Sequence, residues 1–244
     1  MIVSKKLFGF LFALISGALV FISLLMVTPI YLIIFLSGGK NADKTAHKLS
    51  RIWASWVLIS CGVRLIVYNR NLIDPNEAYV FISNHRSYLD IPVAARATTN
   101  TFKFLAKEEL GKVPLLGYII KKLYITVRRQ SIRDKVMALQ KMETELKKGI
   151  SVWLYPEGTR NKTDEALTEF QDGAFTVAVN TGKPIAILSV YDTREVLDSR
   201  SSFQVIPGKV NAWWSEPIET KGLTRKDIPA LKERVIELMK THIG

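Results

Sequence analysis

The sequence contains a long uncharged stretch, which limits what the chain can fold into. Residues 7–39 carry no charged side chain and are bounded by Lys6 and Lys40. A helix needs about 20 apolar residues to cross the roughly 30 Å hydrocarbon core of a bilayer, so the stretch is long enough for a membrane helix. It is too long for the apolar core of a signal peptide and lacks a small-residue cleavage site, so we expect it to be retained. Pro29 should kink or end its first helix.

A second, amphipathic helix is predicted over residues 43–60. Apolar residues including Trp53 and Trp56 recur there at helical spacing, and the other face carries basic residues and His47. Tryptophan on such a helix is typical of a membrane interface. Basic residues flank the uncharged stretch on both sides, although they prefer the cytoplasmic side of a membrane. We therefore predict a helical hairpin in one leaflet over residues 1–60, with a single transmembrane helix over residues 7–28 as the alternative.

The rest of the chain, residues 61–244, alternates short apolar runs with helical patterns. We expect strands at residues 65–68, 79–83, 102–106, 125–127, 152–155, 185–190 and 210–214, and helices at 133–148, 170–180 and 224–242. This alternation is typical of an α/β domain with a mostly parallel or mixed central sheet flanked by helices. The predicted organisation is an N-terminal membrane-associated two-helix segment followed by this domain.

A net charge of +12 favours an anionic partner, which can be a lipid surface, a nucleic acid or a phosphorylated substrate. A protein that binds single-stranded nucleic acid would place aromatic side chains among surface Lys and Arg. Here Trp53 and Trp56 lie on an apolar face, and Trp213 and Trp214 lie in a predicted strand. We therefore expect no nucleic acid. A non-catalytic basic membrane-binding protein remains an alternative. Cys61 is the only cysteine, so no internal disulfide can form.

The first candidate for chemistry is the pair His85 and Asp90, which follows the strand predicted at residues 79–83. Ser87 and Asp90 form an S-x-x-D pattern that is typical of a helix start. With His85 in the turn and Asp90 in the first helical turn, the carboxylate can reach back to the imidazole. An Asp bonded to Nδ1–H would leave Nε2 free to accept a proton. The simpler alternative is a capping Asp beside a half-exposed His. We expect His47 and His242 at the surface.

Other candidates also follow predicted strands. Glu157, Gly158, Thr159 and Arg160 come after the strand at 152–155, and Lys107 and Arg128 each follow a strand of their own. Gly permits a tight turn, and the planar guanidinium of Arg binds phosphate or carboxylate through two N–H groups. A plain β-turn and solvated surface charges are the alternatives. No cluster has the spacing of metal ligands, and there is no P-loop, so we expect neither a metal nor a cofactor.

Together, these segments resemble the 1-acylglycerol-3-phosphate O-acyltransferase (lysophosphatidate acyltransferase) family of glycerolipid acyltransferases. N-H-R-S-Y-L-D matches the motif N-H-x-x-x-x-D, and Y-P-E-G-T-R matches F-P-E-G-T-R with Tyr155 in place of Phe. Between them, K-E-E-L, P-L-L-G and the strand before Arg128 match in order and spacing, and the resemblance covers about residues 64–215. Three positions depart from the family pattern, namely Asn161 for Ser, Gln171 for Lys and Ile187 for Pro.

The resemblance implies that His85 and Asp90 are the catalytic pair. It also implies that Lys107, Arg128 and the stretch Glu157, Gly158, Thr159 and Arg160 hold the glycerol phosphate of the acceptor. The expected reaction transfers a fatty acyl group from a coenzyme A or acyl-carrier-protein thioester to the free hydroxyl of 1-acylglycerol 3-phosphate, with His85 as general base. The alternative acceptors are glycerol 3-phosphate and another lysophospholipid. We expect the protein at the bilayer, with its active site on the cytoplasmic face.

Overall fold

The computed structural model describes residues 2–39, 41–128, 131–200 and 204–243, and its centre is a seven-stranded sheet with the order β1-β7-β6-β2-β5-β3-β4. Neighbouring strands are parallel except β6 and β7, so the sheet is mixed, as the sequence predicts. Each predicted strand overlaps an observed one. The strands are β1 (Val63–Tyr68), β2 (Val80–Ser83), β3 (Phe102–Lys107), β4 (Tyr124–Val127), β5 (Ser151–Leu154), β6 (Ile185–Tyr191) and β7 (Gly208–Trp214).

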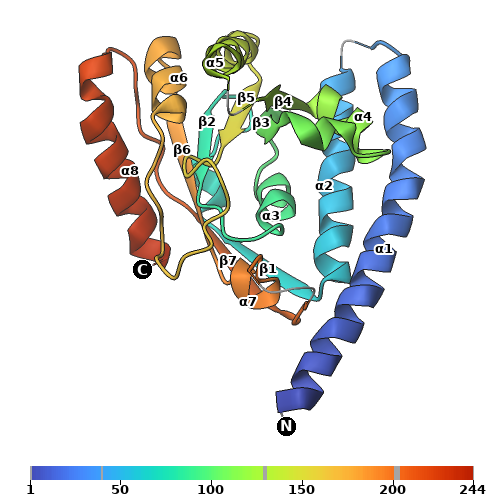
Figure 1. Ribbon diagram of the computed structural model, residues 1–244. Helices are drawn as coiled ribbons and strands as arrows, with labels where there is room; N and C mark the ends of the chain where they lie inside the picture. The colour runs from blue at the N-terminus through green and yellow to red at the C-terminus, as the bar shows by residue number, and fades with distance from the viewer. Residues whose placement is uncertain (1, 40, 129–130, 201–203, 244) are drawn as a thin grey trace.

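Helices cover both faces of the sheet (Figure 1). The helices of the chain are α1 (Ile2–Leu36), α2 (Ala42–Ser60), α3 (Asp90–Ala97), α4 (Leu116–Leu123), α5 (Ile132–Lys147), α6 (Gly173–Thr181), α7 (Thr193–Val196) and α8 (Ile228–Ile243), with 3₁₀ turns η1 (Arg70–Leu72), η2 (Glu108–Lys112) and η3 (Arg225–Asp227). Phe81 faces a core shared with α2 and α3, whereas Val80 and Ile82 face a core shared with α5, α6 and α8. The central strands β2, β5 and β6 are buried on both faces, and they are accordingly nearly continuous apolar runs.

The first two helices form an antiparallel pair along one side of the molecule (Figure 1). Among the described side chains, three hydrogen bonds join them: Ser16 Oγ to Ser60 O at 2.7 Å, Trp53 Nε1 to Ser23 Oγ at 3.0 Å, and Tyr31 OH with Ser50 Oγ at 2.7 Å. Pro29 lies inside α1 and does not end it, so of the two predicted effects, a kink or an end, the second does not occur. The packing of Tyr31 against α2 holds the helix together beyond the proline, since Tyr31 is completely buried.

The outward side of α1 is apolar and bare. Among the described residues, Lys6–Leu36 is the one helical stretch long and apolar enough to cross a membrane. Its exposed large side chains are Leu7, Phe8, Phe10, Leu11, Leu14, Ile15, Leu19, Phe21, Ile22, Leu25, Met26, Ile30, Leu32, Ile33 and Leu36. A patch of this extent on a protein surface marks contact with a membrane or another protein.

Helix α2 lies between α1 and the sheet. Ala54 and Leu58 belong to the core beneath the sheet, whereas Ile52 and Trp56 are exposed. The expectation that His47 lies at the surface is wrong, because its side chain is buried with its ring 4.9 Å from that of Phe102. Burial, together with the charges of Arg51 and Lys103, lowers the pKa of His47 from 6.5 to about 3.

Candidate active site

Three adjacent parallel strands bring the candidate residues to one edge of the sheet. Strand β2 lies between β5 and β6, and all three run in the same direction. Their carboxyl ends lead into the loop with His85, the loop from Tyr155 to Arg160, and α7. In open α/β sheets, this edge is where ligands bind.

The His85–Asp90 pair is formed as the sequence suggests. His85 Nδ1 lies 2.8 Å from Asp90 Oδ2, and the same oxygen accepts hydrogen bonds from the backbone N–H groups of Arg86, at 2.7 Å, and Ser87, at 2.8 Å. The carboxylate is 1% exposed. Its other oxygen, Oδ1, accepts a hydrogen bond from Thr193 Oγ1 at 2.7 Å. With Nδ1 held by Asp90, Nε2 is the ring nitrogen that remains to act on a substrate.

The capping pattern has a different role from the predicted one. Asp90 is itself the first residue of α3, and its carboxylate closes the turn before the helix. The Ser87 hydroxyl donates to Leu197 O at 2.7 Å instead of capping α3. Ser87 therefore joins this turn to the chain after α7, and it is not placed as a nucleophile.

Tyr155 packs against the imidazole. The two rings are 4.1 Å apart between centroids and inclined by 22°. The Tyr155 hydroxyl is buried without a hydrogen-bond partner among the described residues, and burial raises its pKa well above the ordinary value. A stacked ring restricts the plane of the imidazole, so Tyr155 supports the orientation that Asp90 sets.

The carboxylate of Glu157 ties the two loops of the site together. Oε1 accepts a hydrogen bond from His85 N at 2.8 Å, and Oε2 accepts from Thr168 N at 3.0 Å and Thr168 Oγ1 at 2.8 Å. Gly158 has φ +70°, which a residue with a side chain adopts at a cost. Thr159 is exposed, and the Arg160 guanidinium lies 3.5 Å from the centroid of the Tyr88 ring, a cation–π contact.

Lys107 and Arg128 lie at the same edge, further along the sheet. Lys107 is the last residue of β3, and Arg128 directly follows β4. These are the two strands beyond β5 in the sheet. Lys107 Nζ is 3.4 Å from Glu109, and Arg128 makes a two-pronged ion pair with Glu108 that lowers the pKa of the Glu108 carboxyl. Thus hydrogen bonds join His85, Asp90 and Glu157, whereas Lys107 and Arg128 are placed on the shared edge with acidic partners of their own.

The family model described as Acyltransferase matches residues 64–191, a range that includes His85, Asp90, Lys107, Arg128 and the stretch from Glu157 to Arg160. The chain belongs to the acyltransferase family.

Relatives and a solved structure agree with this membership. The chain is 29% identical over 218 residues to 1-acyl-sn-glycerol-3-phosphate acyltransferase BAT2, chloroplastic, of Brassica napus, covering 88% of this chain and 62% of that protein. It is 32% identical over 209 residues to the human 1-acyl-sn-glycerol-3-phosphate acyltransferase beta, covering 83% and 73%. The chain thus spans about three fifths of the length of the plant relative.

The crystal structure of the 1-acyl-sn-glycerophosphate (LPA) acyltransferase PlsC from Thermotoga maritima has the same fold. The TM-score is 0.85 with 25% sequence identity, and the match covers 98% of this chain and 96% of that one. The match therefore extends beyond the acyltransferase domain to α1 and α2.

The sequence analysis assigned no role to three further residues of this site. Asn84 donates to Val190 O at 2.7 Å and accepts from Val190 N at 2.8 Å, which holds the end of β2 to β6. Asn161 N donates to His85 O at 2.7 Å, and Thr193 holds Asp90. The available signal for Thr193 was its place three residues after the strand predicted at residues 185–190. Within the part of the chain that the structure describes, no group of His, Cys, Asp and Glu could hold a metal ion.

Proposed function

We propose that this protein transfers a fatty acyl group from an acyl thioester to the free hydroxyl of 1-acylglycerol 3-phosphate and forms phosphatidate. The observation that carries the proposal is the buried Asp90 carboxylate, which holds His85 Nδ1 at 2.8 Å at the substrate-binding edge of the sheet. The names of the relatives supply the acceptor, since they act on 1-acyl-sn-glycerol 3-phosphate.

In the proposed reaction, His85 Nε2 takes the proton of the acceptor hydroxyl as its oxygen attacks the thioester carbonyl. A carbon–oxygen bond forms, the carbon–sulfur bond breaks, and the leaving thiolate receives the proton from the imidazolium. Asp90 stabilises the imidazolium between these two steps. Because a thiol is a good leaving group, the reaction needs no enzyme nucleophile and no cofactor. The co-substrate is the thioester of coenzyme A or of acyl-carrier protein.

The acceptor phosphate would lie among Lys107, Arg128, Arg160 and the Gly158–Thr159 backbone. Arg160 rests on an exposed tyrosine, and the exposed Arg128 pairs with a half-exposed carboxylate, so either guanidinium can exchange its partner for a phosphate. Glu157 would act indirectly, because its carboxylate already binds His85 N and Thr168. Its part in the proposal is to hold the loop that presents Arg160.

The proposal places residues 1–60 at the membrane and the catalytic domain, residues 61–244, on its cytoplasmic side. The bare apolar side of α1 would enter one leaflet, and the +12 charge would attract anionic lipid and the anionic acceptor. The cytoplasmic face follows from the basic residues on both sides of the uncharged stretch.

The test is acyl transfer by protein purified in detergent. Labelled acyl-coenzyme A and acyl-carrier protein are offered separately with 1-acylglycerol 3-phosphate, glycerol 3-phosphate or a lysophospholipid with another headgroup. We expect labelled phosphatidate from the first acceptor and a raised acceptor KM in Arg128→Ala and Arg160→Ala. Arg→Lys should rescue only in part, because an ammonium cannot make two parallel bonds. Preference for either other acceptor would replace the assigned substrate, and no transfer to any acceptor would leave a non-catalytic membrane-binding protein.

A further inference from the structure

The short helix α7 lies against both halves of the site. It follows β6 directly and starts after Asp192, which has φ +69°, a left-handed conformation that Asp tolerates better than most residues. Its first two residues are almost completely buried, Thr193 at 2% and Arg194 at 8% exposure. A buried arginine is costly unless its hydrogen bonds are satisfied, so its contacts indicate what it does.

Thr193 contacts the catalytic half. Its hydroxyl donates to Asp90 Oδ1 at 2.7 Å, while the opposite oxygen of the same carboxylate accepts from His85, Arg86 and Ser87. The carboxylate is therefore held at both oxygens. A carboxylate free to rotate about its last bond would present a different lone pair to His85 and loosen the imidazole.

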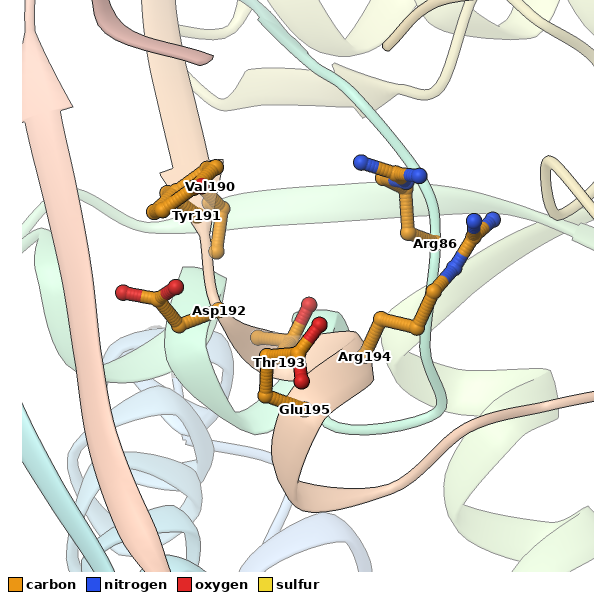
Figure 2. A pocket seen from close by; sticks show the side chains of 7 residues that line it. All are labelled: Arg86, Val190, Tyr191, Asp192, Thr193, Arg194 and Glu195. Carbon is orange, nitrogen blue, oxygen red and sulfur yellow. The ribbon is translucent and has the colours of Figure 1, made fainter. Parts of the chain in front are cut away.

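Arg194 contacts the loop that follows Arg160. Nη1 donates to Thr163 O at 2.6 Å, and Nη2 donates to Asn161 O. Figure 2 shows the side chain reaching from α7 towards the segment that carries Arg86, beside a cavity of about 70 Å³. The hydrogen bonds of its two terminal nitrogens thus go to backbone carbonyls of the segment that sets where Arg160 lies.

We propose that α7 positions both halves of the site through these adjacent side chains. Thr193 orients Asp90 and thereby His85, and Arg194 holds the loop that presents Arg160 to the acceptor phosphate. The inference rests on the proposed function and extends it to two residues that are not expected to touch the substrate. Two neighbouring residues on one helical turn should therefore have separable kinetic effects.

Thr193→Val tests the first half, since valine keeps the shape and removes the hydroxyl. We expect kcat to fall about ten- to hundredfold, as for the loss of a hydrogen bond to a charged group, with the acceptor KM within about twofold. Thr193→Ser should restore kcat, and Thr193→Ala replaces the valine variant if that variant does not fold.

Arg194→Lys tests the second half. One ammonium cannot bond both carbonyls, so we expect the acceptor KM to rise about tenfold with kcat within about threefold. Arg234→Lys, on the exposed side of α8, is the matched control and should equal the wild type in both parameters.

Two measurements do not depend on activity. In ¹⁵N-histidine-labelled protein, the His85 Nδ1 signal should move in Thr193→Val and return in Thr193→Ser. Hydrogen exchange of residues 159–165 should quicken in Arg194→Lys and stay unchanged in Arg234→Lys. Folded variants without these changes would overturn the inference, as would a serine variant that behaves like valine or equal effects of both substitutions on kcat and KM. A wild type that is inactive on 1-acylglycerol 3-phosphate would instead overturn the proposed function, and the NMR and exchange results would still decide the inference.

Discussion

Asp90→Asn should lower kcat substantially while keeping the geometry of the site. Three N–H groups, from His85, Arg86 and Ser87, point at Asp90 Oδ2. An amide NH₂ in that place would face three donors, so the asparagine oxygen must occupy the Oδ2 position. The amide nitrogen then takes the Oδ1 position, where the Thr193 hydroxyl can turn and accept its hydrogen bond. His85 therefore keeps its proton on Nδ1.

The loss is then mainly the negative charge opposite the imidazolium. Replacing a charge-assisted hydrogen bond with a neutral one costs about 1–2 kcal/mol. The attraction between unit charges about 4 Å apart is roughly 4 kcal/mol at an effective dielectric constant of 20. We therefore expect a loss of about 2–4 kcal/mol, which is roughly a 30- to 1000-fold decrease in kcat. The acceptor KM should not change, since Asp90 does not contact the acceptor.

The assay is phosphatidate formation at saturating thioester over a range of acceptor concentrations, with Asp43→Asn on α2 as a control distant from the site. A decrease of about 10⁴-fold or more would mean that the amide flips and the tautomer is lost, as when the corresponding geometry fails in a Ser-His-Asp triad. Activity close to the wild type would mean that the charge is not used, and the assignment of His85 as general base would be wrong.

Three further outcomes are expected. His85→Ala should abolish phosphatidate formation, and His242→Ala should keep it, because the site contains only the first of these rings. His47→Gln should make the stability of the protein less sensitive to acid. The unfolded chain binds a proton at His47 near pH 6.5, whereas the folded chain binds it only near pH 3. The stability of the wild type is therefore complete above pH 6.5 and falls as pH decreases. Urea titrations in detergent at pH 7 and 4.5 measure the free energy of unfolding. Its decrease between the two pH values should be about 2.5 kcal/mol larger in the wild type than in the variant. The side of the membrane on which α1 begins can be measured in sealed vesicles with an impermeant maleimide, using Lys6→Cys in a Cys61→Ser background. We expect this cysteine to react from the same side as a cysteine placed on the exposed face of α8. Reaction from the opposite side would mean that α1 crosses the bilayer.

The strands of the sheet were predictable because burial on both faces leaves a simple signal. Short β-branched and aromatic runs such as Val80–Ser83 predict buried strands, and the observed strand ends lie within two residues of the predicted ones. The His85–Asp90 bond was also predictable, since five residues of sequence separate the two side chains and a turn is enough to close the distance.

The supports of that pair were not predictable by the same means. Thr193 lies 103 residues from Asp90, and Tyr155 reaches His85 only because β5 pairs with β2. The sequence around Thr193 or Tyr155 does not indicate which distant residue its side chain contacts. His47 shows a different failure: the periodicity of α2 was assigned one apolar and one polar face, whereas α2 buries residues against the protein and also exposes apolar residues on its outer side. A pattern analysis that assumes one apolar face cannot place a residue on a helix that has apolar residues on both its inner and its outer side.

The contacts along α1 favour the proposed orientation of this helix in the plane of the membrane. Gly9 O accepts from Val205 N at 3.1 Å, and Tyr31 contacts Ser50, so one side of α1 touches the rest of the chain between these points. They are roughly 33 Å apart along the helix, about the thickness of the hydrocarbon core. If α1 stood across the bilayer, the polar backbone packed beside it would be drawn to the same depth, where unsatisfied groups are costly. Lying flat, as we propose, α1 would bury its bare apolar side in lipid and keep the domain in water, so a lysolipid could present its hydroxyl to His85 while its chain stays in the leaflet.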